Sequence, residues 1–370
     1  MKIAFQRTQI LLLCAFASFV FGGSPLTAQT AKAKVRAVRW EKLEIRFDSI
    51  AYYNGVPFTG RAEYYFPQEK DGRPRLAKRA EFLNGIFHGE FAKLRPNGDF
   101  QLRETYKNGI KNGPFYYYYE NGKVEVMGEF INEVIDGLVQ GFYASGKKYY
   151  INRYTMGERN GLCEAFFENG NKETESRYRM GVPVGEHYGF FDNGAIRFYK
   201  NFNDSGSLHG PHYYYHSTGC AAIEEYYKNG KLDSLQRAWD ALSCALIKTG
   251  YWNEGKENGT FAEFNMFGDT IKLTQFKEGK KHGLQGEYRV EKDPKTNLRY
   301  RAVETEGNYV DGFAHGPWVY GKKSCFQSRE GTYDMGVKVG EWKYYDHKCE
   351  ILLIQKYDTN GSLLEEEAFD

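Results

Sequence analysis

Residues 106–130 read "YKNGIKNGPFYYYYENGKVEVMGEF", and their spacing recurs along most of the chain. If Tyr106 is position zero of this stretch, further aromatics lie at steps of 24 residues on both sides of it, with two one-residue delays, extra residues around 68–75 in the first repeat and an insertion at 290–299. Self-similarity at a fixed period of this size is the signature of a repeat protein. The series consists of Tyr52, Phe82, Tyr106, Phe130, Tyr154, Tyr178, Phe202, Tyr227, Tyr251, Phe276, Tyr309, Tyr333 and Tyr357.

Two glycines recur within each repeat, and a second aromatic follows about five residues after the second glycine. Glu133 replaces the first glycine once, and Ser234 replaces the second once. Aromatics make up 17 % of the chain and 41 glycines stand against 10 prolines, which favours β-structure over helix. Each repeat is therefore predicted to form one β-hairpin. Type I′ turns are expected at the Asn-Gly pairs that begin at Asn97, Asn121, Asn169 and Asn193.

A single hairpin is only marginally stable in water, so neighbouring hairpins must stack and bury their aromatics together. We predict an all-β fold, an elongated single-sheet solenoid of about twelve stacked 24-residue hairpins. Two strands per repeat would make a sheet about 115 Å long. The second aromatic column, which includes Tyr118 and Phe142, is predicted to be its core. The protein is expected to be a monomer.

Residues 1–28 are predicted to be a cleaved export signal. They combine Lys2 and Arg7 with an apolar run from Ile10 to Phe21 that is too short to span a bilayer. A periplasmic or extracellular location is therefore expected, without membrane contact beyond export. The remaining predicted segments are a lead-in or cap over 29–51, repeats 1–7 over 52–226, a degenerate repeat over 227–250, repeats 9–12 over 251–356 and a cap over 357–370.

Residues 231–250 depart from the repeat pattern, because Ser234 stands at the second glycine and no Asn-Gly pair follows. Their apolar residues recur three or four apart, which is the spacing of an amphipathic helix. Two interpretations stay open, a short helix near 233–247 or a degenerate hairpin. The apolar residues concerned are Leu235, Ala238, Trp239, Leu242, Ala245 and Leu246.

The spacing of glycines and aromatics in residues 106–130 and in "YRMGVPVGEHYGFFDNGAIRFYKNF" (178–202) resembles the MORN repeat. The closest type is the MORN repeat variant of bacterial proteins labelled antitoxin-like. The resemblance extends from about residue 52 to residue 361. It implies an elongated array of β-hairpins that serves as an interaction platform and has no catalytic residues of its own.

Charge and motif content disfavour several function classes. Lys plus Arg number 50 and Asp plus Glu 48, so no charge-driven affinity for nucleic acid or anionic membrane is expected. His209, His212 and His216 invite a metal site, but about 13 Å along a strand separates the last two, too far to share one ion. No nucleophile motif stands out. We therefore expect no enzyme activity, no metal and no cofactor.

Strand alternation places the neighbours of the second aromatic column on the other face of the sheet. These neighbours form either a second core layer or an exposed aromatic strip, and such a strip marks a partner surface. Residues beside them are mostly Gly, Ala, Glu and Lys, which favours a protein partner. The alternative is a glycan or cell-wall ligand that stacks on the rings. The partner-binding candidates are Tyr117, Tyr119, Tyr143, Phe167, Phe191 and Tyr214.

Four cysteines form two pairs at matching sites of neighbouring repeats. Cys220 and Cys244 are 24 residues apart, and so are Cys325 and Cys349. Export permits disulfides, but equivalent sites two strands apart lie about 10 Å from each other, beyond the roughly 7 Å Cα limit for a bridge. We predict both disulfides, with turns that lean together, and a buried free thiol at Cys163.

Overall fold

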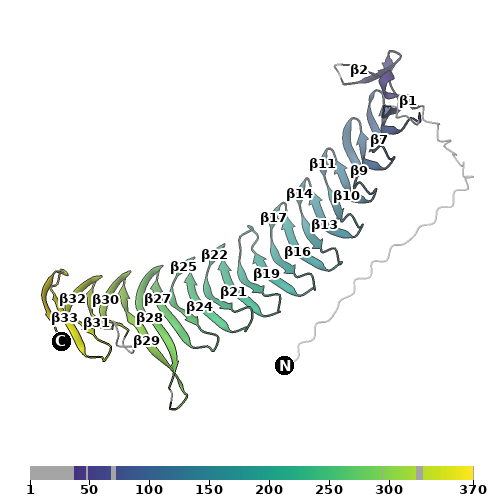
Figure 1. The fold of residues 1–370 in the computed structure, drawn as a ribbon. Coiled ribbons are helices and arrows are strands. Elements are labelled where there is room, and N and C mark those ends of the chain that lie inside the picture. The colour runs from purple at the N-terminus through teal and green to yellow at the C-terminus, as the bar shows by residue number, and fades with distance from the viewer. Residues whose placement is uncertain (1–36, 47–48, 68–71, 294, 322–327, 370) are drawn as a thin grey trace, which may run out of the picture.

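The structure is a computed structural model that describes residues 37–46, 49–67, 72–293, 295–321 and 328–369. The predicted export signal and Cys325 lie outside these residues. Within them the chain is almost entirely β-strand, arranged as one 31-stranded sheet and one three-stranded sheet. Figure 1 shows the strands stacked in chain order into a long curved array. The prediction of an all-β, elongated single-sheet solenoid is confirmed.

A small second sheet and a short 3-10 helix close the N-terminal end of the array. β1 pairs in parallel with β5, the first strand of the repeat hairpins. Val38 and Phe58 are buried there against Phe82, and Trp40 packs beside them. The elements of this end are β1 (Ala37–Arg39), η1 (Trp40–Lys42), β2 (Glu44–Ile45), β3 (Ala51–Tyr53) and β4 (Val56–Pro57).

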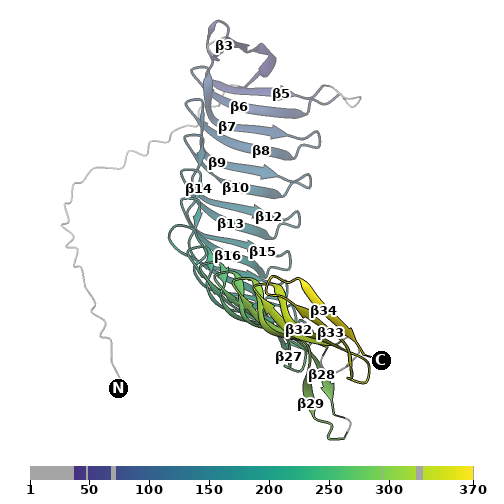
Figure 2. The same ribbon diagram turned by 90° about the vertical axis from the view of Figure 1, so that its left-hand side faces the viewer.

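The repeat hairpins provide the other strands, and neighbouring strands pair antiparallel. Figure 2 shows the strand direction turning along the array. The strands are β5 (Gly60–Tyr65), β6 (Leu76–Leu83), β7 (Ile86–Leu94), β8 (Phe100–Lys107), β9 (Ile110–Tyr118), β10 (Val124–Ile131), β11 (Val134–Ile135), β12 (Gly137–Phe142), β13 (Lys148–Thr155), β14 (Glu158–Arg159), β15 (Gly161–Phe166), β16 (Lys172–Arg179), β17 (Val182–Pro183), β18 (Gly185–Phe190), β19 (Ile196–Phe202), β20 (Gly210–Tyr215), β21 (Ala221–Lys228), β22 (Lys231–Leu232), β23 (Ser234–Trp239), β24 (Leu246–Asn253), β25 (Lys256–Glu257), β26 (Gly259–Phe264), β27 (Thr270–Lys277), β28 (Lys280–Lys292), β29 (Arg299–Val310), β30 (Phe313–Tyr320), β31 (Arg329–Asp334), β32 (Val337–Tyr345), β33 (Ile351–Tyr357) and β34 (Leu363–Ala368).

The register of the sheet repeats from hairpin to hairpin. The second glycine of each repeat pairs with position zero of the next, as Gly137 does with Tyr154. Ser234 follows the same rule, but its partner is Trp252. Position zero of this repeat is therefore Trp252, and the assignment of Tyr251 from the sequence was wrong. One extra residue in the preceding turn moves the register by one, which turns Tyr251 to the opposite face.

Turns with two left-handed residues lie between the repeat hairpins rather than inside them. At Asn108 and Gly109 both φ angles are positive, as a type I′ turn requires. At the pair that begins with Asn121, only the glycine has a positive φ, so the prediction of type I′ turns inside the hairpins was wrong. Asn121 acts through its side chain instead. Its Oδ1 accepts a hydrogen bond from the Lys123 N–H at 3.1 Å, which fixes a longer turn.

The degenerate repeat is a hairpin, and the alternative of a short helix near 233–247 was wrong. β23 pairs with β21 on one side and with β24 on the other. The apolar spacing of this segment is the same as that of a helix, but two flanking strands supply a ladder of backbone hydrogen bonds that favours the extended form. Leu242, which a helix would have buried, lies at the exposed turn.

A disulfide joins Cys220 to Cys244 across the turns of two neighbouring hairpins. Their Cα atoms lie 5.7 Å apart, closer than equivalent sites two strands apart in a regular sheet. Cys244 has a φ of 57°, in the left-handed region, within a turn that closes from Asp240 to Ala245. This irregular turn brings the two sulfurs together. Cys349 is also disulfide-bonded, and Cys163 is a buried free thiol.

Candidate functional site

One column of side chains forms the core of the array, nine or ten residues after position zero of each repeat. We call it the core column and its side of the sheet the core face. Trp318 packs between the position-zero aromatics of successive repeats, Tyr309 and Tyr333, and Phe261 does the same between Trp252 and Phe276. A Cβ added at Gly307 would overlap Trp318. The buried members are Phe115, Val139, Cys163, His187, His212, Phe261, Trp318 and Trp342.

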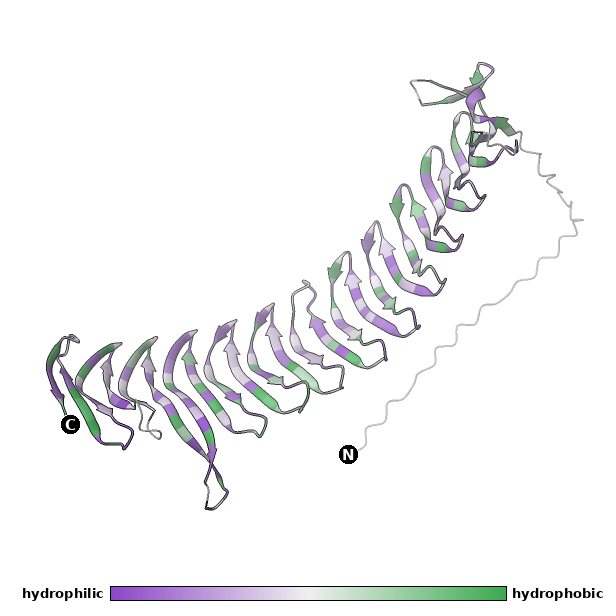
Figure 3. Cartoon of the chain, viewed as in Figure 1, coloured by the Kyte–Doolittle hydropathy of each residue, from purple (hydrophilic) through white to green (hydrophobic). Residues whose placement is uncertain are grey.

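The second aromatic column lies on the opposite face, and its members Tyr118 and Phe142 are only half-buried. Phe115 lies on the core face, so alternation along β9 places Tyr118 on the other face. Alternation along β12 separates Phe142 from Val139 in the same way. The prediction that Tyr118 and Phe142 form the core was wrong. Figure 3 shows hydrophobic and hydrophilic residues interspersed along the whole array, as expected for a sheet one layer thick.

Two partner-binding candidates, Tyr117 and Tyr214, lie on the core face. They follow Phe115 and His212 by two residues, and the Tyr117 ring packs on Phe115 with centroids 5.3 Å apart. The Tyr117 hydroxyl donates a hydrogen bond to Glu104 Oε1 at 2.9 Å. Burial, followed by this hydrogen bond, raises the pKa of Tyr117 to about 12. Tyr117 is therefore a structural side chain as well as a candidate contact.

The other four candidates occupy one site at the start of the hairpin turn, and all are half-buried. The Tyr119 hydroxyl donates to the Phe142 carbonyl of the next repeat at 2.7 Å. Tyr143 does the same to Phe166 at 2.8 Å. Phe167 and Phe191 stand at this site without a hydroxyl. The two tyrosines thus join the turns of neighbouring repeats through hydrogen bonds. Phe167 and Phe191 cannot make this hydrogen bond, because they have no hydroxyl.

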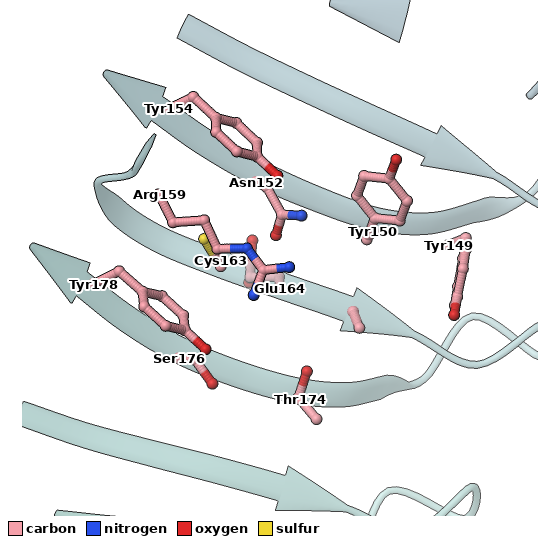
Figure 4. Close-up of a pocket in the computed structure, with 11 residues that line it drawn as sticks. Tyr149, Tyr150, Asn152, Tyr154, Arg159, Cys163, Glu164, Thr174, Ser176 and Tyr178 are labelled. Carbon is pink, nitrogen blue, oxygen red and sulfur yellow. The ribbon is translucent and has the colours of Figure 1, made fainter. Parts of the chain in front are cut away.

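A hollow of about 410 Å³ opens on the core face between β13, β15 and β16. Figure 4 shows Arg159 extending between the rings of Tyr154 and Tyr178, with Cys163 at the same level of the sheet. The Arg159 guanidinium lies 5.4 Å from the centroid of the Tyr178 ring. Asn152, Thr174, Ser176 and Glu164 belong to the polar lining, and Glu164 Oε1 lies 2.7 Å from Lys172 Nζ. Sequence inspection missed this site, although Cys163 stood out where other repeats place an aromatic.

The histidines expected to be structural sit apart in the fold. His212 is buried in the core column, with its Nε2 3.1 Å from the Asn201 carbonyl oxygen. His216 lies at the turn site of Tyr119, with its Nε2 3.1 Å from the Trp239 carbonyl oxygen. No group of three or more His, Cys, Asp or Glu side chains in the described part of the chain is arranged to hold a metal ion. Among the same residues, no helix has the length and hydropathy to cross a membrane.

Residues 111–132 match the protein family described as "MORN repeat variant". This segment is similar to a MORN repeat variant. The matched segment covers β9 and β10, the hairpin that carries Phe115, Tyr117 and Tyr119. The repeats that follow keep the register of this MORN hairpin, since Gly137, like Gly113, pairs with position zero of the next repeat. The MORN family indicates a repeat protein for interaction with a protein or ligand.

No curated protein matches the chain. A solved structure titled "Crystal Structure of TcdB2-TccC3-Cdc42" matches with 10 % identity and a TM-score of 0.16. The match covers 85 % of this chain, which spans 23 % of that chain. A score of this size is too low to transfer a fold or an activity, so the similarity to the MORN repeat rests on the sequence match over residues 111–132.

Proposed function

We propose that this protein is an exported, non-catalytic MORN-repeat scaffold that binds another protein in the cell envelope. The observation that carries the proposal is the open sheet itself. In the described part of the chain, stacked hairpins leave both faces of the large sheet without a second β-layer, and half-buried aromatics such as Tyr118 and Phe142 line the face opposite the core column. Half-buried aromatic side chains in adjacent repeats offer a continuous contact surface of the kind that partners bury.

Two observations support export. Residues 1–28 have the basic start and short apolar run of a cleaved signal. The Cys220–Cys244 disulfide belongs in an oxidising compartment, because cytosolic reductants keep most thiols reduced. Cell fractionation tests this part of the proposal. We expect the mature chain, shortened at its N-terminus, in the periplasmic or secreted fraction, and a full-length cytosolic chain would contradict export.

A pull-down of the mature protein from its own envelope fraction tests the scaffold function. We expect mass spectrometry to find one protein enriched over a matched bead control. A triple variant, Tyr118→Ser, Phe142→Ser and Phe166→Ser, removes aromatics of the opposite face and should lose that partner, whereas Phe267→Ser, an exposed aromatic in the turn between β26 and β27, serves as the control. Retention of the protein on purified cell-wall glycan, without any protein partner, would instead support the glycan alternative.

A further inference from the structure

Lysine or arginine recurs on the core face five residues after position zero. Most of these side chains pair with a carboxylate or lie over an aromatic ring. Lys111 is the clearest example, because its Nζ lies 2.8 Å from Glu104 Oε1. Glu104 is only 6 % exposed. Burial alone would raise the pKa of Glu104, but hydrogen bonds from Lys111 and Tyr117 lower it on balance. The carboxylate is thus held ionised beside its cation. Lys338 at the same repeat position lies over the Trp342 ring, 4.5 Å from its centroid.

Arg159 holds this position in the repeat of Tyr154, but its surroundings are different. The residue that corresponds to Glu104, two before position zero, is Asn152, which has no charge. No ion pair found among the described residues includes Arg159. A hydrogen bond with Tyr154 raises the pKa of Arg159, so the guanidinium stays charged at any physiological pH. Among the described residues Arg159 is therefore a cation without a carboxylate partner, since Glu164, the carboxylate in the lining of the hollow, pairs with Lys172.

The same repeat also lacks the bulky core side chain. Cys163 takes the place that Phe115 fills in the matched MORN hairpin. Ser176, two before the next position zero, is small as well. The hollow of about 410 Å³ opens at this place, and Tyr154 and Tyr178 form two of its walls. A small side chain at the core site and a neutral one beside the cation thus occur together in one repeat.

We infer that this hollow binds the carboxylate side chain of an acidic segment of the protein partner, with Arg159 as its anchor. The planar guanidinium fork matches a carboxylate in a bidentate geometry. A single cation balances a single negative charge. The tyrosine rings of Tyr154 and Tyr178 can pack on the methylene groups of a glutamate, while Asn152 and Ser176 provide groups that hydrogen-bond a peptide backbone. The inference rests on the proposed binding of a protein partner and names the chemistry that the partner must carry.

Fluorescence anisotropy with labelled acetyl-tetraglutamate amide tests the site on the mature protein. We expect Arg159→Gln to weaken binding about tenfold, the size expected for loss of a hydrogen bond between charged groups. Cys163→Phe restores the bulk found at Phe115 and should block the hollow with Arg159 still present. Arg153→Gln, on β13 and on the face opposite the hollow, should leave binding unchanged. Circular dichroism checks the fold of each variant, and if Cys163→Phe fails to fold, Arg159→Gln and Arg159→Lys decide the question.

Several results would overturn the inference. They are no binding of tetraglutamate to the unaltered protein, equal binding to Arg159→Gln, or displacement by inorganic phosphate or a galacturonate trimer as effective as displacement by free tetraglutamate. The pull-down separates this inference from the scaffold proposal. If the unaltered protein and Arg159→Gln capture a partner equally well, the result supports the scaffold function and contradicts the proposed carboxylate site at Arg159. A failure of the unaltered protein to capture any partner would count against the scaffold, and the tetraglutamate measurement would then test the site at Arg159 by itself.

Discussion

At the scale of single residues, unlike side chains perform the same task at the core column. The Trp342 Nε1 donates to the Thr332 carbonyl at 3.1 Å. The His187 Nε2 lies 2.9 Å from the equivalent carbonyl, that of Arg177. A carbonyl oxygen can only accept, so His187 must carry its proton on Nε2. A buried imidazole thus replaces an indole by keeping the one ring N–H that the repeat requires.

This replacement makes stability depend on pH. Burial lowers the pKa of His187 and of His212. The folded state therefore favours the neutral rings. Their full contribution to the free energy of unfolding is present above a pH of about 6.5, the pKa of histidine in the unfolded chain. It is lost as the pH falls through the lower folded pKa values. We expect thermal unfolding at pH 5 to occur below that at pH 7.5, and His187→Trp, which keeps a ring N–H donor, to reduce the difference. If the unfolding temperature of His187→Trp falls between pH 7.5 and pH 5 by as much as that of the unaltered protein, this explanation is contradicted.

Burial also sets the cost of truncating an aromatic. Phe115→Ala should destabilise the array by about 3–5 kcal/mol, the usual cost for a buried Phe. Phe142→Ala should cost less, because Phe142 is half-buried on the opposite face. Urea unfolding midpoints of the two variants provide the comparison. Equal shifts would mean that both columns are equally buried.

The core column was hard to predict because its residue type varies while its burial does not. Phe115, Cys163, His187 and Trp342 share one site, whereas the opposite column is aromatic in nearly every repeat. A search for recurring residue types therefore selects the half-buried column. The hollow at Arg159 was missed for the same reason, since it exists only where Cys163 and Asn152 coincide in space.

At the scale of the element, the turn between hairpins joins successive repeats. The Gly109 N–H donates to the Phe87 carbonyl of the preceding repeat at 2.8 Å, and Gly157 makes the same contact with Ile135 at 2.9 Å. The residue before each glycine is also left-handed. The 24-residue period and hairpin type were visible in the sequence, but the turn type was not, because Asn-Gly pairs occur at both kinds of turn.

Met156 is a poor residue for this turn and offers a test of the turn assignment. Its φ is 50°, a region that costs a non-glycine residue about 1–2 kcal/mol and that asparagine tolerates better. Because the Met156 side chain is 74 % exposed, Met156→Asn loses little burial. We expect this variant to be stabilised by roughly 0.5–1 kcal/mol in urea unfolding. Met266→Asn, at an exposed turn residue whose φ is not left-handed, should show no gain.

The disulfide between two neighbouring turns makes a second prediction at this scale. Closing a loop of this length restricts the unfolded chain, so Cys220→Ser should lower stability by about 3 kcal/mol. Cys244→Ser should have the same effect, and the double variant should be no worse than either alone. Non-reducing peptide mapping of the mature chain should find Cys163 as its one free thiol. Recovery of Cys220 and Cys244 as free thiols would contradict the disulfide between the two turns.

At the scale of the whole molecule, the array is extended because each hairpin contacts mainly its neighbours. Successive strands pair in chain order from β5 to β34. This order follows from the repeat period, which is why the overall architecture was predictable from the sequence. The N-terminal closure through β1 and the second sheet was predicted only as a lead-in, since its residues have no repeat pattern to follow.

Small-angle X-ray scattering of the mature protein tests the central claim, an open array without a globular core. A rod about 115 Å long, from two strands per repeat, has a radius of gyration of about 33 Å, and curvature reduces this to about 30 Å. We predict a value close to that, with the mass of a monomer. A radius of gyration of about 21 Å, expected for a compact domain of this length, would contradict the account.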